Sequence, residues 1–296
     1  MRKLYGMVCA LITPMTNNRA VDEESLGSFC KYLVDAGVHS LYPNGTNGES
    51  LSLTVEERKQ TAMRMVESND GKSVLYIQCG AGTVADSYQL VRHAAGLPVD
   101  GVGLMTPVFF PMDDISMHKY YADILKELPE LTFYAYNIPS RTGNDLSVAT
   151  LGRLMDEYAN LKGIKYSSPD LLRIKDYASC GKGTADVLIG CDSLALSCLM
   201  EGGRGYVSGP GAVFPKAFAS IYDAYAAGNF DAARAAQARV VRISKQFAGI
   251  PEIPAIKYML WKKDVIATPV CRMPLRELDR AERGRLDDLL VRERDE

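Results

Sequence analysis

Eight short β-rich runs alternate with helical patterns in this chain, and this alternation limits its fold more than any other feature. The runs span residues 7–14, 39–45, 73–80, 101–107, 132–139, 161–168, 185–192 and 203–209. The stretches between them carry apolar residues three and four positions apart, the period of an amphipathic helix, at 22–37, 54–68, 86–96 and 147–160. Eight such units over about 225 residues predict a (β/α)8 TIM barrel, with a doubly wound sheet as the alternative fold.

The strand signals stop near residue 214, and the rest of the chain is helical in pattern. Apolar periodicity covers residues 214–228, 229–247, 253–264 and 274–295. One of these helices is expected to complete the barrel. The division predicted from this change is a (β/α)8 barrel over residues 1–225 and an appendage of C-terminal helices over residues 226–296.

Composition excludes several classes of function. The chain is 47% hydrophobic and 24% charged with a formal net charge of -2, which is typical of a globular protein and does not attract nucleic acid. Since no apolar run reaches the ~18 residues of a membrane span, no membrane contact is predicted, and a cytoplasmic location is expected. The seven cysteines include no C-x-x-C pair and the three histidines have no metal-ligand spacing, so no metal is predicted.

Lys165 stands at the centre of the strand-like run LKGIKYSS, residues 161–168. Side chains alternate along a strand, so Lys165 points into the barrel if the bulky Ile164 and Tyr166 face the helices. Burial disfavours the charged ammonium, and a neutral amine attacks a ketone to form a Schiff base. An ion pair with a barrel carboxylate, or a strand register shifted by one residue, explains the position as well.

Other strand ends also carry polar residues. Tyr136 lies in the run TFYAYNIP and is followed by Asn137. Its phenol can shuttle protons if a neighbour assists it, or it is a core tyrosine whose hydroxyl is satisfied. Arg141, in the next loop, can bind a carboxylate with two hydrogen bonds, or it is a solvated surface residue. Both alternatives remain open from position alone.

The loop GTNGES, residues 45–50, follows the second strand. It offers backbone N–H groups and the Thr46 hydroxyl, and Gly45 and Gly48 allow a ligand to approach closely. No Lys-Ser or Lys-Thr follows the second glycine, so a carboxylate cradle explains the loop better than a nucleotide site. The run GAGTVA from Gly80 resembles a dinucleotide fingerprint, but it is discounted because no second strand ending in an acidic residue follows.

The motifs GTNGES, YNIPSRTG and GIK, on eight strand-helix units with a helical C-terminus, resemble the dihydrodipicolinate synthase and N-acetylneuraminate lyase superfamily over the whole chain. The resemblance implies a class I lyase or aldolase that needs no metal or cofactor. Pyruvate or another 2-oxo acid would condense onto Lys165, with Tyr136 and Thr46 as its catalytic partners. The residues assigned to substrate binding are Gly45, Asn47, Gly48, Arg141, Ser167, Gly190, Asp192 and Val207.

Within the superfamily, YNIPSRTG resembles the synthases, in which the arginine matching Arg141 receives the carboxylate of aspartate semialdehyde. We therefore predict a lyase like 4-hydroxy-tetrahydrodipicolinate synthase. The synthases also use a relay tyrosine in a TPYY segment that reaches across a dimer contact. Here the segment is TPVFFP, and Val108, Phe109 and Phe110 are assigned to a second site or subunit interface, with the phenylalanines also expected to make the outer wall of the site more apolar.

Two further departures keep alternatives open. Asn47 replaces the usual second threonine of the loop, and Ser193 follows Asp192 where the lyases have an acidic pair. The alternatives are an N-acetylneuraminate lyase or 2-keto-3-deoxy sugar acid aldolase, a catalytically silent 2-oxo acid binding or regulatory protein, and an unrelated barrel with a structural lysine. The expected partners are small 2-oxo acids and aldehydes, and the resemblance implies a homotetramer built as a dimer of dimers.

Overall fold

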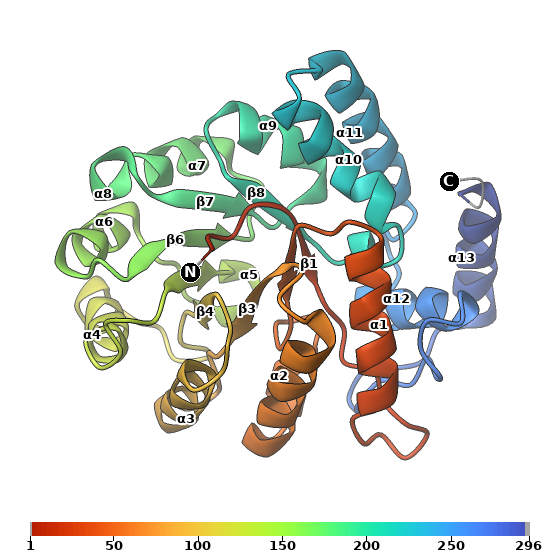
Figure 1. Ribbon diagram of the computed structural model, residues 1–296, viewed down its shortest axis with the longest axis horizontal. Coiled ribbons are helices and arrows are strands. Elements are labelled where there is room, and N and C mark those ends of the chain that lie inside the picture. Colours follow the sequence, from red (N-terminus) through yellow and green to blue (C-terminus); the bar gives the residue numbers. More distant parts are fainter. Residues whose placement is uncertain (1, 294–296) are drawn as a thin grey trace.

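In the computed structural model, which describes residues 2–293, eight strands close into one parallel barrel (Figure 1). They are β1 Gly6–Ala10, β2 Ser40–Tyr42, β3 Val74–Gln78, β4 Gly101–Met105, β5 Phe133–Asn137, β6 Leu161–Tyr166, β7 Asp186–Ile189 and β8 Gly205–Ser208. Each strand pairs with the next, and β8 pairs with β1. The predicted (β/α)8 barrel is confirmed, and the doubly wound alternative is wrong because the sheet has no free edge.

Helices surround the barrel. They are α1 Glu23–Asp35, α2 Val55–Asn69, α3 Val84–Ala95, α4 Asp114–Leu125, α5 Pro139–Thr142, α6 Val148–Glu157, α7 Leu171–Ala178, α8 Cys180–Gly183, α9 Ala195–Met200 and α10 Pro215–Ala226. Short 3-10 turns lie at Ser50–Ser52, Asp192–Leu194 and Pro210–Ala212. The four helices predicted between strands are confirmed as α1, α2, α3 and α6, with small differences at their ends.

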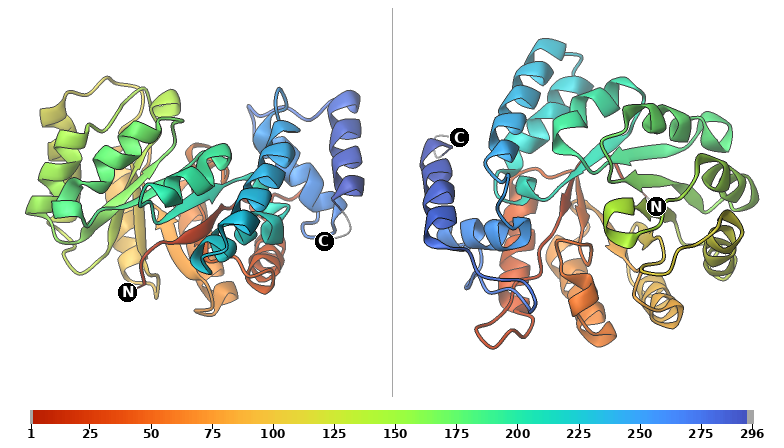
Figure 2. Two further views of the ribbon diagram at one scale, coloured as in Figure 1. Left: turned by 90° about the horizontal axis from the view of Figure 1, so that it is seen from above. Right: turned by 180° about the vertical axis from the view of Figure 1, so that it is seen from behind.

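The appendage contains α11 Phe230–Lys245, α12 Glu252–Lys262 and α13 Arg280–Arg292. In both Figure 1 and Figure 2, α12 and α13 lie on one flank of the barrel, beside α1 and α11. The proposed division at residue 225 falls within the last turn of α10 and stays a prediction. No helix in the described chain is long and apolar enough to cross a membrane.

The prediction of helix over 274–295 is wrong for residues 274–279. Helix α13 begins at Arg280 because the Asp279 side chain accepts a hydrogen bond from the Glu282 N–H, and the Glu282 carboxylate accepts one from the Asp279 N–H. This capping box satisfies N–H groups that the helix itself leaves free, and it fixes the first turn. Residues 294 and 295 lie outside the described residues.

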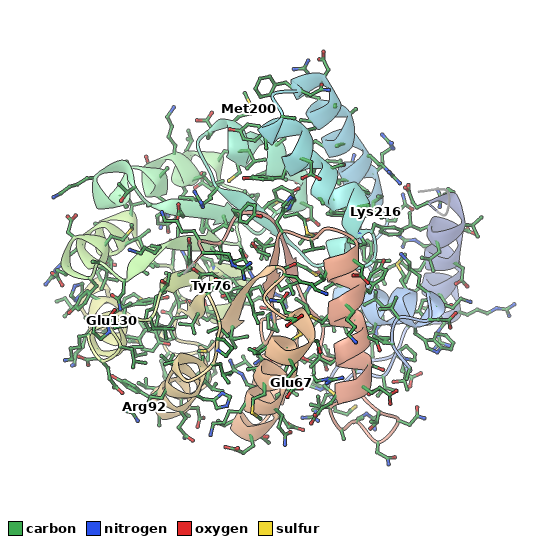
Figure 3. All side chains as sticks on the ribbon, viewed as in Figure 1. Glu67, Tyr76, Arg92, Glu130, Met200 and Lys216 are labelled. Atoms are coloured by element: carbon green, nitrogen blue, oxygen red, sulfur yellow. The ribbon has the colours of Figure 1, made fainter. Side chains whose placement is uncertain are left out.

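Side chains fill the fold in two layers. A small cluster inside the barrel includes Val8, Tyr42, Tyr76, Tyr134, Leu188 and Val207. A larger cluster between strands and helices includes Ile164 and Tyr166, the residues predicted to face outward. In Figure 3, Tyr76 lies among the strands, whereas Glu67 and Arg92 lie on the outer helices. Because packed side chains fill the barrel interior, a ligand site forms at the strand ends.

Candidate active site

A cavity of about 580 Å³ opens at the carboxyl ends of the strands, within the size range of small-molecule sites. Most of the predicted site residues line it: Thr46, Asn47, Tyr136, Arg141, Lys165, Ser167, Gly190, Asp192 and Val207. The appendage contributes Val241, Ser244, Lys245, Ala248 and Glu252, which the sequence did not single out. The cavity therefore lies between the barrel and the appendage.

Lys165 lies in β6 and is only 4% exposed. Its Nζ lies 3.8 Å from the centre of the Tyr136 ring and 4.7 Å from that of Tyr42. The side chain thus points toward the barrel axis, as the strand alternation predicts, and the register shifted by one residue is wrong. Within residues 2–293, no carboxylate forms an ion pair with this lysine, so the alternative of a structural ion pair finds no partner there.

Tyr136 stands directly beside Lys165 in the sheet, because β5 and β6 pair these two residues. It is 2% exposed, and its hydroxyl lies 3.1 Å from Thr46 Oγ1. Burial opposes ionisation of the phenol, but the Lys165 charge and hydrogen bonds from Thr46 and Ser167 outweigh it and hold the pKa of Tyr136 below its usual value. Thr46 thus supplies the predicted assistance from a neighbour, and the lowered pKa makes this phenol a better proton carrier than an ordinary tyrosine.

The loop at residues 45–50 brings backbone donors to the cavity. Glu49 N–H bonds Thr46 O and Ser50 N–H bonds Gly45 O, which folds the loop into a compact turn. In the described chain, the N–H groups of Thr46, Asn47 and Gly48 have no hydrogen-bond acceptor. Gly45 and Gly48 themselves do not line the cavity. Free N–H groups in one turn form a concavity that binds anions such as a carboxylate.

The wall on the side of β6 and β7 depends on a glycine. A Cβ atom at Gly190 would lie 2.1 Å from Ser167 Oγ, so a larger residue would displace this hydroxyl.

Arg141 lies in the short helix α5, is exposed, and forms no ion pair with any residue that the structure describes. Its guanidinium is therefore available to an anionic ligand.

Two carboxyl groups face the outer part of the cavity. Asp192 Oδ1 is enclosed and has no hydrogen-bond partner in residues 2–293, while Oδ2 lies 3.4 Å from Ser244 Oγ. Burial raises the pKa of Asp192 to about 7; a hydrogen bond with Ser208 opposes the rise, and the Glu252 carboxylate adds to it. Glu252 was missed because it lies in a helix with no sequence signal for function.

The TPVFFP segment is not part of the cavity in this chain. Phe109 and Phe110 are 83% and 71% exposed, and Phe109 has a backbone φ of +78°. Val108 is half-buried against the cluster of Met105, Tyr136 and Ile138. The expectation that the two phenylalanines make the outer wall apolar is therefore not met within one chain.

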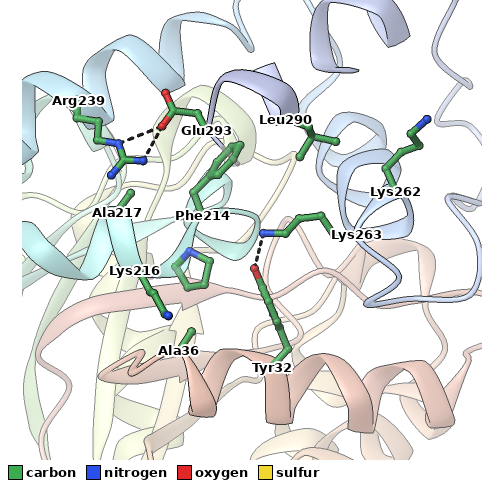
Figure 4. A pocket seen from close by; sticks show the side chains of 11 residues that line it. Tyr32, Ala36, Phe214, Lys216, Ala217, Arg239, Lys262, Lys263, Leu290 and Glu293 are labelled. Carbon is green, nitrogen blue, oxygen red and sulfur yellow. Dashed lines mark hydrogen bonds and ion pairs between the residues drawn. The ribbon is translucent and has the colours of Figure 1, made fainter. Parts of the chain in front are cut away.

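A second cavity, of about 290 Å³, lies between α1, α10 and the appendage helices, away from the strand ends (Figure 4). Lys263 Nζ donates to the Tyr32 hydroxyl at 2.8 Å, and Arg239 pairs with Glu293 at 2.6 Å. The first contact joins the appendage to the barrel, and the second joins α11 to the end of α13 within the appendage. None of the predicted site residues lines this cavity. Across residues 2–293, no three His, Cys, Asp or Glu side chains gather in an arrangement that could hold a metal ion.

Known proteins resemble the whole chain. A model of the Dihydrodipicolinate synthetase family matches residues 3–293. A 4-hydroxy-tetrahydrodipicolinate synthase of Methanococcus maripaludis is 30% identical over 91% of this chain and 93% of its own. An N-acetylneuraminate lyase of Rattus norvegicus is 34% identical over 70% of this chain and 66% of its own. A crystal structure of dihydrodipicolinate synthase from Aquifex aeolicus superposes with a TM-score of 0.93 at 27% identity, covering 98% of each chain.

Proposed function

Since this chain belongs to the dihydrodipicolinate synthetase family and is related to lyases, we propose that it forms a Schiff base between Lys165 and pyruvate or a related 2-oxo acid. The observation that carries the proposal is the position of the lysine. Its amine lies buried beside the cavity, between the rings of Tyr136 and Tyr42, with no carboxylate partner in the described chain. A lysine in such surroundings is suited to act as a nucleophile.

The proposed reaction begins when the Lys165 amine attacks the C2 carbonyl of the 2-oxo acid and its oxygen leaves as water. The protonated imine draws electrons from C3, and Tyr136 removes a C3 proton to give the enamine. C3 then attacks the aldehyde carbon, and the aldehyde oxygen takes up a proton. Water hydrolyses the imine and frees the lysine. The imine itself serves as the electron sink, so the proposed steps use no metal or cofactor.

The first candidate for the second substrate is a carboxylate-bearing aldehyde, as in a reaction like that of 4-hydroxy-tetrahydrodipicolinate synthase. Arg141 supports this candidate because it lines the cavity and lacks an ionic partner in residues 2–293. A guanidinium binds a carboxylate with two parallel hydrogen bonds. Phe109 has no hydroxyl, so a relay through this position would need another proton carrier.

The second candidate is a hydroxyl-bearing aldehyde, as a 2-keto-3-deoxy sugar acid aldolase or an N-acetylneuraminate lyase would release. Asp192 supports it, since this carboxyl lines the cavity and forms no ion pair in the described chain. Glu252 adds a second acidic group to the same cavity although Ser193 is not acidic. Carboxyl groups of this kind accept hydrogen bonds from substrate hydroxyls.

Borohydride reduction in the presence of pyruvate tests the proposal. The expected product is a reduced adduct that peptide mass spectrometry assigns to Lys165, and its absence would overturn the imine chemistry. A screen with aspartate semialdehyde and with glyceraldehyde, each with pyruvate, then separates the two candidates. Trapping without turnover on any aldehyde would leave the catalytically silent 2-oxo acid binding protein as the better account.

We further propose a homotetramer built as a dimer of dimers, which needs two different two-fold interfaces. Two exposed apolar patches support it. In the first, the exposed rings of Phe109 and Phe110 contact each other, and the Phe109 N–H bonds Thr142 O, next to the cavity residue Arg141. In the second, the exposed side chains of Met200 and Phe230 line a hollow beside α9 and α11. Sedimentation velocity tests the assembly.

A cytoplasmic location stays our proposal, supported by seven cysteines that are all free thiols.

A further inference from the structure

The loop at residues 45–50 is held by the C-terminal appendage. Glu49 forms an ion pair with Lys257 of α12, and the two side chains are 1% and 0% exposed. Lys257 Nζ also donates to Val270 O at 2.9 Å, while Glu49 Oε2 accepts from the Arg272 N–H at 2.7 Å. Both oxygens of this buried carboxylate are thus held by residues that lie far from the loop in the sequence.

The backbone of Glu49 shapes the turn that carries Thr46. Glu49 has a φ of +57°, in the left-handed region that residues other than glycine seldom adopt. Its N–H donates to Thr46 O at 3.0 Å, and the Thr46 hydroxyl in turn lies 3.1 Å from the Tyr136 hydroxyl. A continuous series of contacts therefore joins Lys257 to the phenol beside Lys165. Surrounding contacts must maintain a strained conformation of this kind.

A second contact attaches the same loop to α12. Asn47 Nδ2 donates to Glu252 Oε1 at 3.1 Å. The backbone at Gly209 makes room for this bond, because a Cβ atom there would lie 2.2 Å from Asn47 Nδ2 and 2.4 Å from Glu252 Oε1. The loop is thus tied to α12 on both sides of Gly48. The departure from threonine at Asn47 gives the loop this second attachment.

A buried ion pair is weak support for stability, because desolvation of both charges offsets their attraction. It does fix geometry, since each charge must keep its partner. We propose that Lys257 is a positioning residue that sets the conformation of the loop through Glu49, and so places Thr46 and the free N–H groups for the carboxylate of the 2-oxo acid. This inference rests on the proposed Schiff-base function.

The test is the pyruvate concentration that gives half-maximal borohydride trapping at Lys165 in the full-length protein. Lys257→Met is expected to raise it at least about 10-fold and to slow exchange of the pyruvate C3 hydrogens with D2O, because small displacements of binding groups strongly reduce rates. Lys257→Arg keeps the positive charge and is expected to recover part of the loss. Lys262→Met is the matched control, since Lys262 lies on the same helix with a partly exposed side chain, and it should behave as the wild type.

Removal of one charge from a buried pair can prevent folding. The double variant Glu49→Gln/Lys257→Met removes both charges, and it is expected to fold, by circular dichroism, while keeping the raised half-maximal concentration. Wild-type trapping in the folded double variant would overturn the inference. Failure of the double variant to fold would also overturn it, since the pair would then serve the fold as a whole. If the wild type traps no pyruvate, the proposed function itself fails, and the inference fails with it.

Discussion

The inner and outer halves of the cavity are built differently. In the inner half, Tyr136 contacts both Lys165, on the paired strand, and Thr46, on a tethered loop. In the outer half, Arg141 is exposed and Asp192 keeps one oxygen without a partner in residues 2–293. The groups proposed to act on the 2-oxo acid are therefore held in position before substrate binds. The groups proposed for the second substrate depend on the ligand for their interaction partners. Changes in the two halves should separate imine formation from aldehyde selection.

The largest effect is expected for Lys165→Met, which removes the amine from the inner half. No reduced pyruvate adduct should form at this position, and turnover should fall at least about 1,000-fold, because the buried amine beside Tyr136 is lost. Lys162→Met is the matched control, since Lys162 lies on the same strand but bonds Ala159 O on the exposed side. An equal loss of turnover in Lys165→Met and Lys162→Met would contradict the assignment of the reactive amine to Lys165.

Tyr136→Phe should come next. Without the phenol the inner half still holds the lysine, so pyruvate should still be trapped, but turnover should fall about 100-fold or more because the C3 proton loses its carrier. In the wild type, the limb of the pH-rate profile that reports the ionisation of Tyr136 should have its midpoint below the usual pKa of a tyrosine. In Thr46→Val the limb should move to higher pH, because the Thr46 hydrogen bond lowers the pKa of Tyr136. An unchanged limb would argue against this assignment.

Arg141→Met addresses the outer half. The Michaelis constant for a carboxylate-bearing aldehyde should rise about 10- to 100-fold, the usual effect of a lost charge-assisted hydrogen bond. Pyruvate trapping should remain at the wild-type level. Steady-state kinetics with pyruvate held at saturation measures the first effect. A parallel loss of trapping would mean that Arg141 also binds the 2-oxo acid and that the two halves are not separate.

The smallest effect is expected for Asp192→Asn, measured as thermal stability against pH. Folding raises the pKa of Asp192 from 3.8 to about 7, so between these values the unfolded chain ionises while the folded chain does not, and the wild type loses stability as pH rises. The variant should melt a few degrees above the wild type near pH 8, with the difference vanishing near pH 4. Asp231→Asn, at an exposed position of α11, should show no such trend.

Regular periodicity made the barrel predictable. The eight strands follow from short β-rich runs, and helices α1, α2, α3, α6, α10, α11 and α12 follow from apolar residues three and four positions apart. Lys165 could be oriented from its neighbours Ile164 and Tyr166. The sequence predicted no ranges for helices α4, α5, α7, α8 and α9. The start of α13 was placed too early because apolar spacing alone does not reveal that Asp279 and Glu282 form a capping box.

The long-range contacts of the site could not be predicted. Glu49 and Lys257 are some two hundred positions apart, and nothing in the stretch IPAIKYML marks its lysine as fully buried. Glu252 reaches the cavity only because the appendage packs over the barrel ends. The Tyr42 ring lies 4.7 Å from the Lys165 amine, but in the sequence Tyr42 resembles any other apolar residue of a buried strand. Such contacts depend on tertiary packing rather than on local sequence.

Exchange of the pyruvate C3 hydrogens with D2O, followed by proton NMR without any aldehyde, tests the central claim most directly. It isolates the inner half, since only imine and enamine formation are required. The wild type should catalyse the exchange and Lys165→Met should not. Exchange that persists in Lys165→Met would contradict the assignment of Lys165 as the residue that activates the 2-oxo acid. Absence of exchange in the wild type would contradict it as well.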